Sequence, residues 1–153
     1  MKIDGAHIVF HRLLSTSKCN PYFVRAVLLT KRTLDAPIHP GYWGLIGGKV
    51  NRGERPKETA LREACEELGI RPSKLQSLCK VKVDHVQRSN SAIKYFIAVL
   101  EFDMDKLTLR RNTEEDKVEG EGLGWFSAEE VHHAMLRPED RIAIAAFFRK
   151  YGT

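Results

Sequence analysis

The sequence predicts an α+β fold in which helices cover a mixed β-sheet. Strand-like segments lie before, between and after the predicted helices, and each helix carries a recognisable start signal. With 153 residues, 42% of them apolar and 29% charged, the chain is large enough to bury one hydrophobic core. We therefore expect a single domain over residues 1–153.

The first part of the chain predicts two strands, a loop and a third strand. Residues 6–14 and 22–31 are rich in β-branched and aromatic residues, which favour strands. Two prolines and a glycine interrupt residues 35–42, so we expect a loop there. Residues 43–50, with the sequence WGLIGGKV, then predict a short strand that ends at paired glycines.

The segment 56–68 predicts the first helix. Pro56 suits the first helical turn, and Gly69 suits the position just past the last one. The next predicted segments are strands at 77–86 and 92–102, a polar loop at 110–122 and a short strand at 123–126.

Two helices are expected in the last quarter of the chain. Ser127 and Glu130 form the S-x-x-E pattern of a capping box, which predicts a helix over 128–136. Pro138 begins the last helix, because proline is favoured in a first turn. Its predicted apolar face consists of Ile142, Ala145, Ala146 and Phe148.

Composition argues against several classes of protein. The net charge is +5, but the basic residues are scattered without a block, so we expect no nucleic-acid partner. No apolar run approaches the roughly 20 residues that span a bilayer, and we expect a cytoplasmic protein. Cys19, Cys65 and Cys79 are an odd number of cysteines without metal-type spacing, which predicts reduced thiols.

The predicted helix at 56–68 carries an unusual cluster of acids. At about 100° per residue, we expect Glu63, Glu66 and Glu67 on the face opposite its apolar residues. Glu63 and Glu67 are four residues apart, and such a like-charge pair costs a few tenths of a kcal/mol in an isolated helix. The acids also lie late in the helix, where the macrodipole disfavours negative charge.

A solvated polar face is one explanation of this cluster, and a divalent cation is the other. Clustered carboxylate oxygens suit Mg²⁺ or Mn²⁺, and such ions commonly also hold substrate phosphates. Gly47 and Gly48 allow the backbone to pass close to a ligand. The residues themselves therefore predict metal-assisted chemistry on a phosphorylated substrate.

The segment 48–70 resembles the signature of the Nudix hydrolase family, G-x5-E-x7-R-E-U-x-E-E-x-G-U, where U is a bulky aliphatic residue. The residues in register are Gly48, Glu54, Arg62, Glu63, Glu66, Glu67, Gly69 and Ile70. Ala64 stands at the first U position and is smaller than usual. A chance match of the fixed positions is on the order of one in a million for a chain of this length.

This resemblance implies an α/β/α sandwich that hydrolyses a nucleoside diphosphate linked to another moiety. It implies that Glu63 and Glu67 are the main ligands of Mg²⁺ or Mn²⁺, joined by Glu66 and by the carbonyl of Gly47. Arg62 resembles the family arginine that orients these carboxylates by ion pairing.

The resemblance also implies further residues for catalysis. Glu54 resembles the loop glutamate that supports the metal site, and Glu63 is a candidate general base. Some members recruit a second acid from a distant loop, for which Glu119 and Glu121 are our candidates because they precede the LGWF strand.

Three residues are candidates for contacts with a small-molecule nucleotide. Arg32 and Lys49 are predicted to bind phosphate, and Tyr42 is predicted to stack on a base. Trp43 is expected in the core. The GGK form of the signature resembles the branch that cleaves nucleoside triphosphates, oxidised ones included, to monophosphate and pyrophosphate. We expect a monomer or a homodimer.

Other functions stay open at this point. The fold is shared by ADP-ribose and dinucleoside polyphosphate hydrolases, by nucleotide sensors without turnover and by prenyl diphosphate isomerases. The presence of every acid of the signature favours an active hydrolase over a sensor. The isomerases place a cysteine in a different motif, which argues against the third alternative.

Overall fold

The computed structural model of the chain describes residues 2–15, 22–69, 84–88, 91–99, 111–112, 117–118 and 122–153. The candidate acids Glu119 and Glu121 lie outside these residues, as do Cys19 and Cys79. Within the described ranges, no helix is long and apolar enough to cross a membrane.

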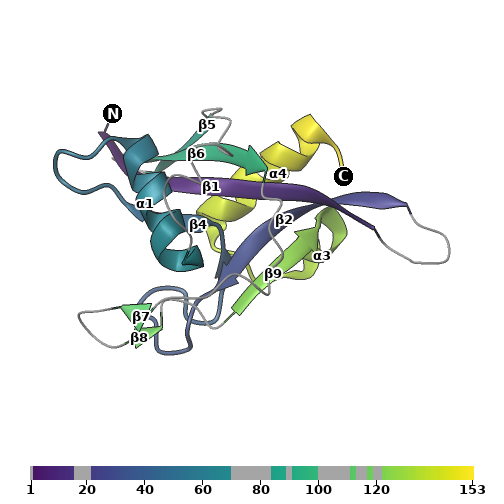
Figure 1. Cartoon of the computed structure of the whole chain (residues 1–153), viewed down its shortest axis with the longest axis horizontal. Helices are drawn as coiled ribbons and strands as arrows, with labels where there is room; N and C mark the ends of the chain where they lie inside the picture. Colours follow the sequence, from purple (N-terminus) through teal and green to yellow (C-terminus); the bar gives the residue numbers. More distant parts are fainter. Residues whose placement is uncertain are drawn as a thin grey trace.

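A seven-stranded mixed sheet forms the centre of the molecule (Figure 1). Its strands are β1 (Lys2–Ser15), β2 (Phe23–Lys31), β3 (Trp43–Gly44), β4 (Ile46–Lys49), β5 (Asp84–Arg88), β6 (Ser91–Val99) and β9 (Gly122–Ser127). β1 runs parallel to β6 and antiparallel to β2 and β4, and β2 pairs antiparallel with β3 and β9. The predicted mixed sheet is therefore confirmed.

Helices cover both faces of this sheet. α1 (Pro56–Leu68) lies on one face, and α3 (Ala128–His133) and α4 (Pro138–Tyr151) pack on the other. Side chains of β1 point alternately to the two faces of the sheet, so Ile8 packs in the core under α1 and Val9 packs in the core under α4. The result is an α/β/α sandwich, as the resemblance implied.

The bounds of α1 agree with the prediction. Pro56 occupies the first turn, and Gly69 ends the helix in the left-handed conformation at φ 69°. The Gly69 N–H donates to the carbonyl of Cys65 at 2.9 Å, which closes the last turn. Local cap chemistry is thus sufficient to set both ends of this helix.

Two expectations about chain segments were wrong. The helix predicted over 128–136 ends at His133, because Ala134 adopts an extended conformation that brings the next residues beside β3. There the Trp43 N–H donates to the carbonyl of Met135 at 2.7 Å. The segment 110–122 is not entirely a loop, since β7 (Arg111–Asn112) pairs with β8 (Lys117–Val118) and β9 begins at Gly122.

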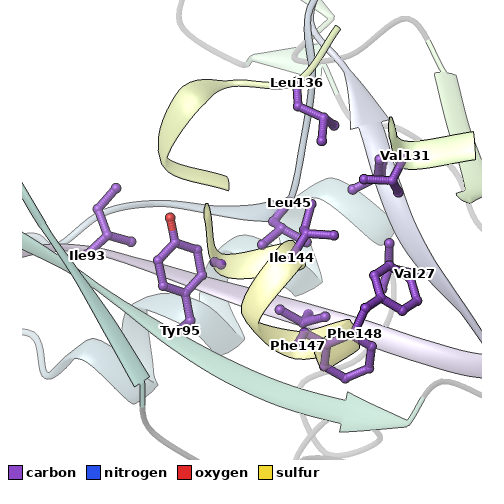
Figure 2. Close-up of a cluster of buried hydrophobic side chains, with 12 residues drawn as sticks. Val27, Leu45, Ile93, Tyr95, Val131, Leu136, Ile144, Phe147 and Phe148 are labelled. Atoms are coloured by element: carbon purple, nitrogen blue, oxygen red, sulfur yellow. The ribbon is translucent and has the colours of Figure 1, made fainter. Parts of the chain in front are cut away.

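The buried face of α4 also differs from the prediction. Ile142 is 58% exposed, and Ala145 is exposed as well. The side chains turned toward the sheet are Asp140, Ala143, Ile144, Phe147 and Phe148. These positions have the expected helical spacing but are displaced around the axis, because a buried polar residue, Asp140, belongs to the inward stripe. Figure 2 shows Ile144, Phe147 and Phe148 packed near Val27 and Leu45.

Candidate functional site

Glu63, Glu66 and Glu67 of α1 were all expected to face away from the core, but two of them do not. Glu67 is only 9% exposed, and Glu63 is also largely shielded, whereas Glu66 faces solvent. Seven residues at about 100° fall only some 20° short of two full turns, so Glu67 lies almost directly above Ala60 on the buried face. The helix therefore directs Glu63 and Glu67 toward the sheet.

The carboxylates of Glu63 and Glu67 lie against two glycines of β4, Gly47 and Gly48. The Gly47 N–H donates to Oε1 of Glu67 at 3.4 Å. A Cβ at Gly48 would overlap the carboxylate of Glu63, and one at Gly47 would overlap the backbone of β1 at Ala6 and His7. The absence of both side chains allows the strand to lie between β1 and the acids of α1.

Arg62 connects the acids with one another. Its Nε and Nη2 donate to the two oxygens of Glu54 at 2.8 and 3.2 Å, and its Nη1 donates to Glu63 at 2.8 Å and to Glu66 at 3.4 Å. Nη2 also donates to the carbonyl of Lys49 at 3.3 Å. One guanidinium thus holds the loop before α1, the outer face of α1 and the end of β4 together.

Two of the acids have shifted pKa values with different causes. Hydrogen bonds from Arg62, aided by one from Thr59, lower the pKa of Glu54 to about 2. Burial raises the pKa of Glu63, although the hydrogen bond from Arg62 acts in the opposite direction. Glu63 is therefore a carboxylate whose negative charge is only partly compensated by the protein.

The donors at this position fit a hard divalent cation. The carboxylates of Glu63 and Glu67 and the carbonyl of Gly47 offer oxygen atoms, the ligand type that Mg²⁺ and Mn²⁺ prefer. The Glu63 carboxylate occupies the space that a Cβ of Gly48 would take, so the glycine allows this oxygen donor to lie directly against β4. Among the residues that the structure describes, no three His, Cys, Asp or Glu side chains form a ready-made metal cluster, and Arg62 serves as counter-ion to these acids.

A cavity of about 410 Å³ has Gly48 in its wall, although none of the acids of α1 lines it. Arg32 and Lys49 both line it, so the structure brings these two predicted phosphate-binding residues together. Tyr42 is not among its lining residues; its ring lies 5.2 Å from that of His39, which does line the cavity. The wall also includes His7, Arg137, Asp4 and Glu139.

Sequence reasoning missed a buried polar network beside the cavity. Asp140 is fully buried, and its Oδ1 accepts from Nδ1 of His7 at 2.9 Å and from the hydroxyl of Tyr95 at 3.1 Å. Oδ2 accepts from the N–H of Leu45 at 3.0 Å and from Nε of Arg137 at 2.9 Å. The one available signal was that Asp140 continues the i, i+3, i+4 stripe of α4.

The charge of Asp140 is well supported despite its burial. Burial alone would raise the pKa of this carboxyl, but its interactions with His7 and Arg137 hold the pKa below the ordinary value. Burial and the nearby negative charge of Asp140 raise the pKa of Tyr95. The network is therefore an anion surrounded by donors from four segments of the chain.

Trp43 and Cys65 pack against the two cores, and a pair of adjacent histidines lies on α3. Trp43 packs in the α4-side core, with its ring 4.8 Å from that of Phe126, which agrees with the expectation of a core residue. His132 and His133 are exposed. Cys65 is a reduced thiol packed against the α1-side core.

Comparison with known proteins gives one family. A family model described as the NUDIX domain matches residues 21–147. A nucleoside triphosphatase NudI of Escherichia coli is 50% identical over 44 residues, which is 29% of this chain and 31% of that protein. An uncharacterized Nudix hydrolase of Pseudomonas aeruginosa is 49% identical over 47 residues, 30% of this chain and 28% of that protein. These matches span less than a third of either relative.

Solved structures share the fold along nearly the whole chain. A MutT protein from Methanosarcina mazei Go1 superimposes with a TM-score of 0.62 at 19% identity, covering 99% of this chain and 96% of that one. A binary complex of an Ap4A hydrolase from Caenorhabditis elegans gives a TM-score of 0.63 at 19% identity, covering 96% and 99%. At this level of identity the likeness concerns the fold.

Proposed function

The chain belongs to the Nudix family, and from that premise we propose that it hydrolyses a phosphoanhydride bond of a nucleotide with the help of a divalent cation. One observation carries this proposal. Gly48 both contacts the Glu63 carboxylate, where a Cβ would overlap it, and lines the cavity that holds Arg32 and Lys49. An acidic cluster suited to a cation and a cavity lined by Arg32 and Lys49 therefore meet at Gly48.

In this proposal Glu63, Glu67 and the carbonyl of Gly47 hold Mg²⁺ or Mn²⁺, with Glu66 as an outer ligand. The cation, when bound, neutralises phosphate charge and lowers the pKa of a water molecule. Glu63 lies beside the proposed cation and is our candidate for accepting a proton from this water molecule.

The other site residues act by position and charge. Arg62 and Glu54 keep the acids of α1 in place through their paired hydrogen bonds. Arg32 and Lys49 bind the phosphates from the cavity wall. Tyr42 reaches the nucleotide only through His39, against which its ring packs, so its contribution is at the rim.

A nucleoside triphosphate, cleaved to monophosphate and pyrophosphate, is the substrate we favour. Arg32 and Lys49 in the cavity wall suit contacts with a polyphosphate chain, although Asp4 and Glu139 also line the cavity. The relative NudI is named a nucleoside triphosphatase, and it is 50% identical to this chain over 44 residues. Ap4A, the substrate in the name of one fold neighbour, and ADP-ribose, named in another, are the alternatives.

The test is a Mg²⁺-dependent hydrolysis assay with product identification. The panel contains ordinary and oxidised nucleoside triphosphates, ADP-ribose and Ap4A, and the variants are Glu67→Gln and the control Glu129→Gln on the exposed face of α3. We expect Glu67→Gln to lower kcat/KM at least about 100-fold and Glu129→Gln to leave it unchanged. Binding of nucleotides without turnover would instead identify a sensor.

A further inference from the structure

We infer that Asp140, together with Arg137, is a positioning residue that fixes the Gly47 end of the proposed metal site from the opposite face of the sheet. The inference rests on the proposed function. Neither residue lies in the signature segment, and both belong to the start of α4, whose N-cap is Arg137. Leu45 and His7 connect Asp140 and Arg137 to Gly47. Leu45 precedes Gly47 by two positions in the chain, and His7 lies opposite Gly47 in the antiparallel pairing of β1 with β4.

The first step is the capture of the Leu45 backbone. Its N–H donates to Oδ2 of Asp140 at 3.0 Å, and its carbonyl accepts from Nη2 of Arg137 at 2.7 Å. Both polar groups of a residue two positions before Gly47 are therefore held by charged side chains. Charge-assisted hydrogen bonds are the stronger kind, so the peptide planes that lead into β4 have little freedom.

The second step is the partner strand. His7 stands opposite Gly47 in the antiparallel ladder between β1 and β4, and its Nδ1 is hydrogen-bonded to Oδ1 of Asp140 at 2.9 Å. The two oxygens of the Asp140 carboxylate thus bind His7 on β1 and Leu45 just before β4, which fixes the position of the two strands relative to each other. The direction of the Gly47 carbonyl follows from the relative position of these two strands.

The third step is the close packing of Arg137 on the chain before β4. A Cβ at Gly44 would overlap the guanidinium of Arg137. The Arg137 N–H also donates to the carbonyl of Trp43 at 2.9 Å. Arg137 therefore contacts three consecutive residues that precede β4, and a shift of its side chain would be transmitted to Gly47.

A purely structural role predicts different behaviour from a positioning role. In Asp140→Asn, one carboxylate oxygen becomes an amide NH₂ that faces existing donors. The hydrogen bond from the Leu45 N–H or the one from His7 is therefore lost. Tyr95→Phe removes only one donor to Oδ1, which keeps His7, and it leaves the contacts of Oδ2 intact. Both changes reduce stability, but only the first moves the Leu45–Gly47 segment.

The experiment measures Mn²⁺ binding to the free protein without nucleotide, by the electron paramagnetic resonance signal of unbound Mn²⁺. Thermal unfolding of the apoprotein is recorded in parallel to show that each variant is folded. For Asp140→Asn we expect the Kd for Mn²⁺ to rise about 10- to 100-fold, as for other residues that support metal ligands. For Tyr95→Phe we expect a Kd within about twofold of the wild type even though its melting temperature falls.

An unchanged Kd in folded Asp140→Asn would overturn the inference, as would an equal rise in Tyr95→Phe. If Asp140→Asn does not fold, Arg137→Lys decides, because lysine keeps the charge but cannot hold both Asp140 and the Leu45 carbonyl in the same fork geometry. We expect the Kd of Arg137→Lys for Mn²⁺ to rise, and an unchanged Kd would overturn the inference.

Glu67→Gln separates this inference from the proposed function. If Glu67→Gln binds Mn²⁺ as the wild type does, the metal site is elsewhere, and both proposals are wrong. If Glu67→Gln binds Mn²⁺ weakly while Asp140→Asn and Arg137→Lys bind it normally, only the positioning role is overturned.

Discussion

At the scale of single residues, Arg62 is the side chain on which the acids of the site depend. We predict that Arg62→Lys lowers kcat/KM about 10- to 100-fold, because a lysine cannot contact both oxygens of Glu54 while also holding Glu63. The matched control is Arg55→Lys. Arg55 forms an exposed pair with Glu58, so its replacement should leave kcat/KM unchanged. Equal losses in the two variants would contradict the assigned role of Arg62.

The glycine at the junction of acids and cavity gives a second residue-scale prediction. In Gly48→Ala the new methyl group meets the Glu63 side chain, which must move away from β4 and give up its hydrogen bond from Arg62. We therefore expect a modest fall in the melting temperature and a Kd for Mn²⁺ raised about tenfold. Gly122→Ala is the control, because its Cβ would meet no atom within 4 Å. Normal Mn²⁺ binding by Gly48→Ala would place the cation away from Glu63.

The sequence predicted the residues that one local segment brings together and missed those that the tertiary fold assembles. Glu63, Arg62 and Glu67 lie within two turns of one helix, so their spacing alone brings them close. Asp140 meets partners 133, 95 and 45 residues away, and no local pattern contains such pairs. The Asp140 network therefore could not be predicted from the sequence and is visible only in the three-dimensional structure.

At the scale of elements, caps predicted helix ends better than periodicity predicted helix faces. Gly69 ends α1 and Ser127 begins α3 where expected, because each satisfies backbone groups locally. The face of α4 was predicted wrongly, since apolar residues at positions 142 to 148 are compatible with two neighbouring stripes. The choice between them is made by Asp140, whose partners lie on other elements.

The contact between β1 and α4 should make stability depend on pH. His11 lies against Phe147 and accepts a hydrogen bond from Arg25, and burial followed by the charge of Arg25 lowers its pKa to about 4. In the unfolded chain the pKa is about 6.5. The unfolded state therefore binds more protons between these values, and the contribution of neutral His11 is full above pH 6.5 and is lost as the pH falls toward 4.

We predict that the free energy of unfolding falls by up to about 2 kcal/mol between pH 7 and pH 5 because of His11. Urea titrations at the two pH values measure this difference. His11→Gln should show a smaller difference, and His132→Gln, which alters an exposed histidine on α3, should retain the wild-type one. An unaltered pH dependence in His11→Gln would show that another group is responsible.

At the scale of the whole molecule, two cores share one sheet and should unfold together. β1 supplies Ile8 and Phe10 to the core under α1 and Val9 to the core under α4, so both cores are built on the same strand. The chain contains two tryptophans, one beside each core. Trp125→Phe leaves Trp43 to report on the α4 side, and Trp43→Phe leaves Trp125 to report on the α1 side.

We predict that both single-tryptophan proteins unfold in urea with the same fluorescence midpoint, as a two-state domain requires. Adding Ile144→Ala, which empties a fully buried position on α4, should cost about 2–5 kcal/mol and lower both midpoints equally. Ile142→Ala, on the exposed side of the same helix, should change neither midpoint by much. If Ile144→Ala shifted only the midpoint reported by Trp43, the α4 layer would be an independent unit, and the acids of α1 would be insulated from α4. Equal shifts mean that the α1-side and α4-side cores unfold as one cooperative unit.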